Sequence, residues 1–515
     1  MKKLEFGTAG IRGKIGQNED HLNYAHVQRI AHGYAKYLKN KYPNEKIKVV
    51  IGRDNRLKSY GFSICCAHIL NSYGIEVIYS KNISPTPFVS FCILEYKAHG
   101  GINITASHNP KEYNGIKLYN NMASQCLPEE ISEIVSYFEP YENYSEKYEG
   151  KMLLNKKVCK NLTYISKKTQ DKYLDLILKV GGDIKVENIK VAYSPLHGTG
   201  RNYAKKIFEK LGLNLNENNY QTAFFAKEQM IQTPHFTYCK YPNPEKPEAF
   251  ELLKKVGLKN NIDILLMTDP DSDRVGIAVK DKDGYRLFNG NETATIIFKY
   301  LLDTTPNIDI NKQYLIYSFV SSNVPSVLAK NKNIPSYVVP TGFKWIGMLI
   351  NQFIKENKRC LFAFEESYGS LINEDIARDK DALQSIVILC KMASYYKKQN
   401  KTLINVLDDV YKETGYVASA NVEIIVDENT NLKELQNKFK NLPFNNKVIL
   451  DYNERTDFMK ANMIKIEFTD DNSWLALRPS GTEPKIKFYI FSFDKTEHEA
   501  KVKLEKFKSI IQEML

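Results

Sequence analysis

The sequence lacks the cysteine spacings and the long apolar runs that mark several classes of protein. None of its eight cysteines forms a C-x-x-C pair, so zinc fingers and dithiol redox motifs are not expected. No apolar run approaches the ~20 residues that span a bilayer. Residues Met1 to Glu5 lack the apolar stretch of a signal peptide. We therefore expect a cytoplasmic protein, not a membrane protein, whose cysteines are reduced core thiols.

The sequence also lacks a long basic block and a nucleotide-binding P-loop. The formal net charge is +12, but lysine and arginine are spread along the whole chain. This spread favours a compositional origin of the charge over a nucleic-acid partner, which stays open as an alternative. No G-x-x-x-x-G-K-[ST] motif supports an ATP site. A moderate positive field would still attract an anionic substrate.

Short apolar runs alternate with helix-period segments along the 515 residues. The length indicates three or four domains, and the alternation predicts α/β domains with mostly parallel mixed sheets. Predicted strands cover residues 49–51, 75–79, 189–193, 262–268, 314–319 and 361–364. Predicted helices cover residues 60–73, 203–211, 247–256, 292–302 and 344–356.

Three breaks divide this pattern into four predicted domains. The polar segment 139–168 is the first linker candidate, Asn289-Gly290-Asn291 marks a second boundary, and Gly415 marks a third. The last hundred residues resemble a smaller α+β unit. The predicted domains are α/β at 1–165, α/β at 166–288, α/β at 289–412 and α+β at 413–515.

A serine lies where a predicted strand runs into a turn. Ser107 precedes His108 and Asn109-Pro110, and Asn-Pro favours a turn. We expect Ser107 to be exposed at the end of the strand, where α/β sheets place reactive groups and where a serine can carry a phosphoryl group. Because adjacent residues of an extended chain point to opposite sides, His108 could be a base, a phosphate ligand or a brace. A plain turn serine is the alternative.

An acidic loop follows the apolar strand predicted at 262–268. Its carboxylates, Asp269, Asp271 and Asp273, are two residues apart, so they can converge on one side of an extended loop. Three oxygen ligands suit Mg²⁺, and an arginine at the sixth loop position excludes an EF-hand. That residue, Arg274, offers a fork for phosphate. A solvated acidic turn is the alternative.

A loop near the C-terminus combines groups that bind anions. Arg478 offers a bidentate fork, Ser480 and Thr482 offer hydroxyl groups, and Gly481 permits a backbone nest. The loop is therefore a candidate phosphate anchor, with a structural turn as the alternative. A further polar loop, residues 365–369, follows an apolar strand and would suit sugar hydroxyls.

Taken in this order, the loops resemble those of the α-D-phosphohexomutases. The match covers nearly the whole chain and includes lesser marks at residues 85–87, 113–117, 242–245 and 290–292. Residues 194–200, 341–344 and 364–369 look like the bacterial phosphoglucomutase / phosphomannomutase branch. The resemblance implies three similar α/β domains plus a smaller C-terminal α+β domain around a central cleft.

The resemblance also implies a site and its ligands. It implies Mg²⁺ held by Ser107, Asp269, Asp271 and Asp273, and glucose 1,6-bisphosphate as activator and intermediate. The implied catalytic residues are Ser107, Lys117, Arg12 and His108. The implied substrate-binding residues are Arg274, Thr341, Gly342, Lys344, Glu365, Ser367, Lys380, Arg478, Ser480, Gly481 and Thr482.

The predicted activity is the interconversion of hexose 1-phosphate and hexose 6-phosphate through a phosphoserine, with glucose as the favoured sugar. We expect small sugar phosphates as partners and a monomer or homodimer. Lys117 would accept a proton if neighbouring Arg12 lowered its pKa. The alternatives are a phosphomannomutase or phosphopentomutase of the same family, a haloacid-dehalogenase-like phosphatase with Asp269 as nucleophile, and a non-enzymatic nucleic-acid binder.

Overall fold

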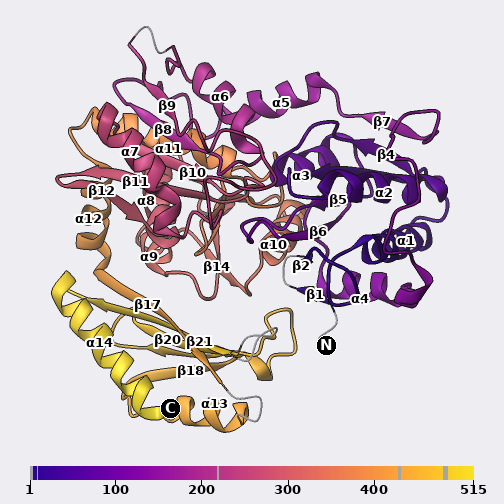
Figure 1. The fold of residues 1–515 in the computed structure, drawn as a ribbon. Helices are drawn as coiled ribbons and strands as arrows, with labels where there is room; N and C mark the ends of the chain where they lie inside the picture. Colours follow the sequence, from indigo (N-terminus) through magenta and orange to yellow (C-terminus); the bar gives the residue numbers. More distant parts are fainter. Residues whose placement is uncertain (1–3, 8–9, 217–219, 427–430, 480–484) are drawn as a thin grey trace.

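The computed structural model describes residues 4–7, 10–216, 220–426, 431–479 and 485–515. Within these ranges the chain forms four β-sheets, and the fourth lies below the other three in Figure 1. The first three sheets mix parallel and antiparallel pairs, whereas the fourth is antiparallel throughout. The predicted fold class is confirmed.

The first sheet has the strand order β1-β2-β6-β5-β3-β4-β7. Its side chains alternate between two cores: Val49 and Ile51 face one, and Val50 faces the other, as the two-residue period of a strand requires. The strands are β1 (Phe6–Gly7), β2 (Gly10–Lys14), β3 (Lys48–Arg53), β4 (Glu76–Tyr79), β5 (Gly100–Ile104), β6 (Tyr113–Asn120) and β7 (Leu162–Tyr164). The helices are α1 (Tyr24–Lys41), α2 (Ser59–Ser72), α3 (Thr86–Glu95) and α4 (Pro128–Ser136), with the 3₁₀ turn η1 (Tyr141–Asn143).

The second sheet has the order β12-β11-β10-β8-β9. Its central strand β10 is a continuous apolar run, and every residue in it is buried, because the sheet is covered on both faces. The strands are β8 (Val191–Ser194), β9 (Ala223–Phe225), β10 (Ile264–Thr268), β11 (Val275–Asp281) and β12 (Gly284–Phe288). The helices are α5 (Lys167–Ile177), α6 (Gly200–Lys210) and α7 (Glu251–Asn260), with the 3₁₀ turn η2 (Pro247–Phe250).

The third sheet has the order β14-β13-β15-β16. The strands are β13 (Gln313–Ser318), β14 (Ser336–Val339), β15 (Arg359–Glu365) and β16 (Gly369–Leu371). The helices are α8 (Gly290–Thr304), α9 (Val324–Asn331), α10 (Phe343–Lys355), α11 (Ala382–Lys397) and α12 (Leu403–Thr414). Helix α11 also packs on α5, α6 and β10 of the second sheet, so these two layers share one core.

The fourth sheet has the order β17-β21-β20-β19-β18 and carries two helices on one face (Figure 1). Its strands are β17 (Tyr416–Ile425), β18 (Lys447–Asp451), β19 (Ile464–Phe468), β20 (Trp474–Pro479) and β21 (Lys485–Asp494). The helices are α13 (Leu432–Lys440) and α14 (Glu497–Met514), with the 3₁₀ turn η3 (Tyr452–Glu454).

The segment predicted as the first linker is not a free connection. Its last part forms β7, which pairs in parallel with β4 at the edge of the first sheet. Leu154 and Cys159 are buried in the same core, because these apolar side chains lie between polar ones that hide the pattern in the sequence. The three predicted domain boundaries stay predictions; each sheet lies within one predicted range.

The cysteines lie in the interior of the protein. All eight cysteines are buried and form no disulfide, so their prediction as core thiols is confirmed. No helix in the described part of the chain is both long enough and apolar enough to cross a membrane.

Candidate active site

Ser107 lies three residues beyond the end of β5, in a tight turn. Its φ of 50° is left-handed, a strained value for a serine that is typical of functional turns. The Thr105 hydroxyl accepts the Ser107 backbone N–H at 2.9 Å. The prediction that Ser107 is exposed is wrong: the residue is 1% exposed, because the acidic loop of the second sheet covers it.

A buried arginine holds the serine loop from behind. Arg56 donates to the carbonyl oxygens of Ser107 at 2.6 Å and Pro110 at 2.7 Å, and also to those of Asn109 and Tyr113. Its Nε lies 3.3 Å from the Asp54 carboxylate. We did not predict this guanidinium from the sequence. The signal was Asp54 and Arg56 directly after β3, at the same sheet edge as Ser107.

Replacing Arg56 with methionine is expected to destabilise the protein by about 3–5 kcal/mol, because Asp54 would remain as a buried, unpaired charge. Calorimetric unfolding of wild type and variant measures this difference. Arg53→Met is the matched control, since Arg53 is only half-buried and makes long bonds to Asp54 and Lys81 carbonyls. Equal melting temperatures of R56M and R53M would contradict the role of Arg56 in holding the serine loop.

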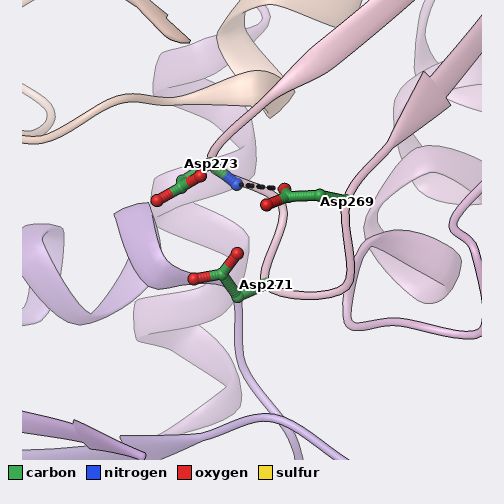
Figure 2. A group of neighbouring side chains, drawn as sticks. All are labelled: Asp269, Asp271 and Asp273. Carbon is green, nitrogen blue, oxygen red and sulfur yellow. Dashed lines mark hydrogen bonds between the residues drawn. The ribbon is translucent and has the colours of Figure 1, made fainter. Parts of the chain in front are cut away.

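The acidic loop connects β10 to β11 and brings three buried carboxylates together (Figure 2). Asp269, Asp271 and Asp273 each place an oxygen within 4.8 Å of the others. Asp269 Oδ1 accepts the backbone N–H of Asp273 and of Arg274, each at 3.1 Å. The convergence predicted from the two-residue spacing is therefore observed.

The serine loop and the acidic loop are in direct contact. The Ser107 hydroxyl donates to Asp269 Oδ2 at 2.7 Å, across 162 residues of sequence. The first and second sheets therefore contribute to one site. The alternatives of a plain turn serine and a solvated acidic turn do not fit groups that are this buried and this close.

The carboxylates leave oxygen atoms suited to a cation. Asp271 Oδ1 and Asp273 Oδ1 are buried without a hydrogen-bond partner among the described residues. Burial and the adjacent charges of Asp271 and Asp273 raise the pKa of Asp269 well above its usual value. Three converging carboxylates that leave two buried oxygen atoms without a partner fit a hard divalent cation such as Mg²⁺.

Lys117 on β6 enters the same cluster. Its Nζ lies 2.8 Å from Asp271 Oδ2 and 2.8 Å from Asp273 Oδ2. Burial favours a lower pKa for Lys117, but the two carboxylates outweigh it and raise the pKa. Arg12 lowers this pKa, as predicted, but its influence is smaller than that of either carboxylate, so the pKa of Lys117 is raised overall and the condition for a base is not met. Lys117 is therefore a charged group here.

Three further candidates lie near the carboxylates. Lys380 Nζ lies 3.3 Å from Asp273 Oδ2, and Arg274 pairs with Glu245 at 2.8 Å. Arg12 on β2 donates to Asn109 Oδ1 at 2.9 Å. Burial lowers its pKa, and the nearby charge of Arg274 lowers it further. Two guanidinium groups this close in charge influence suit the binding of a phosphate.

His108 reaches Ser107 in spite of their adjacency. The left-handed turn at Ser107 places His108 Nδ1 3.3 Å from the Ser107 hydroxyl oxygen. Adjacent side chains point to opposite sides only where the chain is extended, and the chain at Ser107 forms a turn. Burial, with the charges of Arg274 and Arg12, lowers the pKa of His108 well below its usual value. His108 is therefore neutral near pH 7.

The predicted sugar loop connects β15 to β16. Glu365 Oε1 accepts the backbone N–H of Gly342 at 2.6 Å, which joins this loop to residues 341–342 before α10. Burial raises the pKa of Glu365, while the charge of Lys380 opposes this rise. Ser367 and Thr341 are half-buried. These residues lie next to the end of the acidic loop, because Val275, the first residue of β11, donates its backbone N–H to the Tyr368 carbonyl.

Lys344 differs from these neighbours. It lies in the first turn of α10 and is 9% exposed. Burial lowers its pKa, and Glu129 at the start of α4 is the nearby charge that raises it. Lys344 is therefore close enough to α4 for the charge of Glu129 to act on it.

The phosphate loop is only partly described. Arg478 lies on β20, whereas Ser480, Gly481 and Thr482 lie outside the described residues. Burial raises the pKa of Tyr489 on β21; Glu366 adds to this rise and Arg478 opposes it. The sugar loop and the fourth sheet therefore face each other near Arg478.

Gly290, the first residue of α8, supports the sugar loop by close approach. A Cβ at this position would lie 1.8 Å from the Glu366 carbonyl oxygen. Gly290→Ala is therefore expected to displace the loop and to reduce kcat/KM up to about 100-fold, as small misplacements of binding groups can do. Steady-state kinetics measures this change. Gly284→Ala, where nothing lies within 4 Å of the added Cβ although φ is positive, controls for a methyl group that meets no neighbour. Equal kinetics of G290A and wild type would contradict the contact.

Comparisons with known proteins agree with this arrangement. Family models described as phosphoglucomutase/phosphomannomutase, alpha/beta/alpha domains I, II and III match residues 3–145, 171–284 and 289–414. A phosphoglucomutase of Staphylococcus haemolyticus is 34% identical over 511 residues, covering 95% of this chain and 90% of the relative.

Two solved structures show the same fold. The phosphoglucomutase pp63/parafusin of Paramecium, in an open form, has a TM-score of 0.75 at 17% identity and covers 100% of this chain and 95% of its own. The N-acetylphosphoglucosamine mutase of Aspergillus fumigatus, in complex with GlcNAc-6P and magnesium, has a TM-score of 0.55 at 13% identity. The match covers 100% of this chain and 96% of that structure's chain. The chain thus belongs to the phosphoglucomutase/phosphomannomutase family of α-D-phosphohexomutases.

Proposed function

We propose that this phosphohexomutase interconverts glucose 1-phosphate and glucose 6-phosphate through phosphorylated Ser107 and a 1,6-bisphosphate. The observation that carries the proposal is the contact of the Ser107 hydroxyl with Asp269 Oδ2 at 2.7 Å, inside a buried group of three carboxylates. The glucose preference rests on relatives named phosphoglucomutase at 34% identity.

Ser107 would donate its phosphoryl group to the free hydroxyl of a hexose monophosphate. The phosphorus–Oγ bond breaks, and a bond from phosphorus to the sugar oxygen forms. The sugar hydroxyl releases one proton, and Ser107 Oγ takes one up. Neutral His108, whose Nδ1 lies 3.3 Å from this oxygen, is the group that we assign to hold the proton between these positions.

Ser107, Asp269, Asp271 and Asp273 would hold Mg²⁺. When bound, the ion supplies charge neutralisation for the transferring phosphoryl group. Lys117, Lys380, Arg12 and Arg274 supply further positive charge around it, so Lys117 acts as an electrostatic stabiliser in our proposal rather than as a base.

The bisphosphate must turn over within the site so that its second phosphate faces Ser107. Glu365 and Ser367 would bind the sugar hydroxyls, with Thr341 and Gly342 beside them. Arg478, with Ser480, Gly481 and Thr482, would hold the phosphate that is distant from Ser107. Lys344 would assist from the first turn of α10.

A coupled assay tests the substrate. We expect glucose 1-phosphate, with trace glucose 1,6-bisphosphate, to give a higher kcat/KM than mannose 1-phosphate or ribose 1-phosphate. A higher value for either competitor would reassign the sugar within the family. The family matches favour a mutase over the haloacid-dehalogenase-like phosphatase and the nucleic-acid binder. We further propose a cytoplasmic monomer or homodimer.

A further inference from the structure

The acidic loop accepts hydrogen bonds from Thr86, a residue of the first domain. Thr86, the first residue of α3, donates its backbone N–H to the Asp271 carbonyl at 2.8 Å. Its hydroxyl donates to Asp271 Oδ2 at 2.7 Å, across 185 residues of sequence. Both side chains are fully buried, so water does not compete for these bonds.

The direction of the Thr86 hydroxyl proton is fixed by a third buried group. Asn103 Nδ2 on β5 donates to Thr86 Oγ1 at 2.8 Å. Because an amide nitrogen only donates, Thr86 Oγ1 is the acceptor in this bond and its own proton remains for Asp271. The short chain Asn103–Thr86–Asp271 therefore has one consistent hydrogen-bond direction.

This chain decides which oxygen of Asp271 is available. Oδ2 accepts from both Thr86 and Lys117, at 2.7 and 2.8 Å. Oδ1 is buried without a partner among the residues that the structure describes. The carboxylate is thus held in one rotamer, with one oxygen satisfied by protein donors and the other left for a ligand.

We propose that Thr86 is a positioning residue for the divalent cation: it holds Asp271 so that Oδ1 points to the ion. The inference rests on the metal site of the proposed function. Groups that orient metal ligands typically contribute 10–100-fold to metal affinity. Since Thr86 belongs to the first domain and Asp271 to the second, cation affinity depends on the docking of the two.

Binding of Mn²⁺ to the full-length protein tests this role without reference to activity. Free Mn²⁺ is measured by electron paramagnetic resonance, and Mg²⁺ is then used as competitor. Thr86→Val keeps the shape of the side chain and removes the hydroxyl, so its Kd for Mn²⁺ is expected to rise about 10–100-fold. Thr86→Ser restores the hydroxyl and is expected to stay within about threefold of wild type.

Ser90→Ala is the matched control, because Ser90 is a fully buried hydroxyl on the same helix that donates to Ala123 and not to the acidic loop. Its Kd is expected to equal that of wild type. Should T86V not fold, Asn103→Leu removes only the group that orients Thr86 and is expected to weaken Mn²⁺ binding.

The outcomes separate the two hypotheses. A wild-type protein that binds no Mn²⁺ would overturn the metal site, and with it the role of Thr86. A wild-type protein that binds Mn²⁺, together with a T86V or N103L variant of unchanged Kd, would overturn the role of Thr86 alone. Equal losses in T86V and S90A would also overturn it, since the effect would then be one of helix packing.

Discussion

Replacing Ser107 with alanine is expected to reduce kcat about 10⁴–10⁶-fold, the range seen when a nucleophile is removed. The Ser107 oxygen is the atom that would exchange the phosphoryl group, and it is the group in direct contact with Asp269. Alanine fills the same turn, and the oxygen lies against a carboxylate rather than inside an apolar core. The fold is therefore expected to persist while the activity is lost.

Two measurements check the result for Ser107. The coupled mutase assay gives kcat, and intact-mass analysis after incubation with glucose 1,6-bisphosphate is expected to show one phosphoryl group on wild type and none on S107A. Ser63→Ala is the control, since Ser63 is a buried serine of the same domain whose hydroxyl bonds to the Tyr60 carbonyl and the Tyr79 hydroxyl and to neither the serine loop nor the acidic loop. Phosphate on S107A, or full turnover by S107A, would refute the phosphoserine mechanism.

Much of the framework was predictable because local patterns determine it. Strand β10 is an apolar run of strand length followed by Asp269, and the structure begins the acidic loop there. The serine loop follows β5 in the same way. In each case a buried strand ends where a polar loop begins, and the carboxyl ends of such strands are where α/β proteins place ligands.

The contacts between domains were not predictable from local patterns. Ser107 is buried because residues 162 positions away cover it, and no window of the sequence contains that information. The direction of the pKa shift of Lys117 depends on which charges act on it most strongly, and Asp271 and Asp273 outweigh Arg12. The roles of Arg56 and Thr86 likewise follow only from the docked arrangement.

The second large effect concerns the repulsion among the three carboxylates. Asp269→Asn is expected to reduce kcat about 1000-fold, because an electrostatic stabiliser of this kind contributes about 3–4 kcal/mol. The same change is expected to stabilise the metal-free protein by about 0.5–2 kcal/mol, as relief of strain at functional sites often does. Asparagine can still accept the two backbone N–H groups that Asp269 Oδ1 accepts, and it carries no charge.

The difference in stability between D269N and wild type is expected to depend on pH. Burial and the charges of Asp271 and Asp273 raise the pKa of Asp269 above 3.8 in the folded protein, so the folded state favours the protonated form. This contribution to stability is complete below pH 3.8 and is lost as the pH rises through the raised pKa. In EDTA, the melting temperature of D269N is therefore expected to exceed that of wild type increasingly as the pH rises from 4 to 8.

Addition of Mg²⁺ is expected to reverse the order of stability. The ion stabilises a folded protein that binds it in proportion to the logarithm of its concentration over Kd, so wild type gains and D269N gains little. Asp263→Asn is the control, because Asp263 precedes the same strand but pairs with Lys397 at the surface. A D269N protein that melts below wild type in EDTA, or that gains as much from Mg²⁺, would show that the carboxylates do not form a strained cation site.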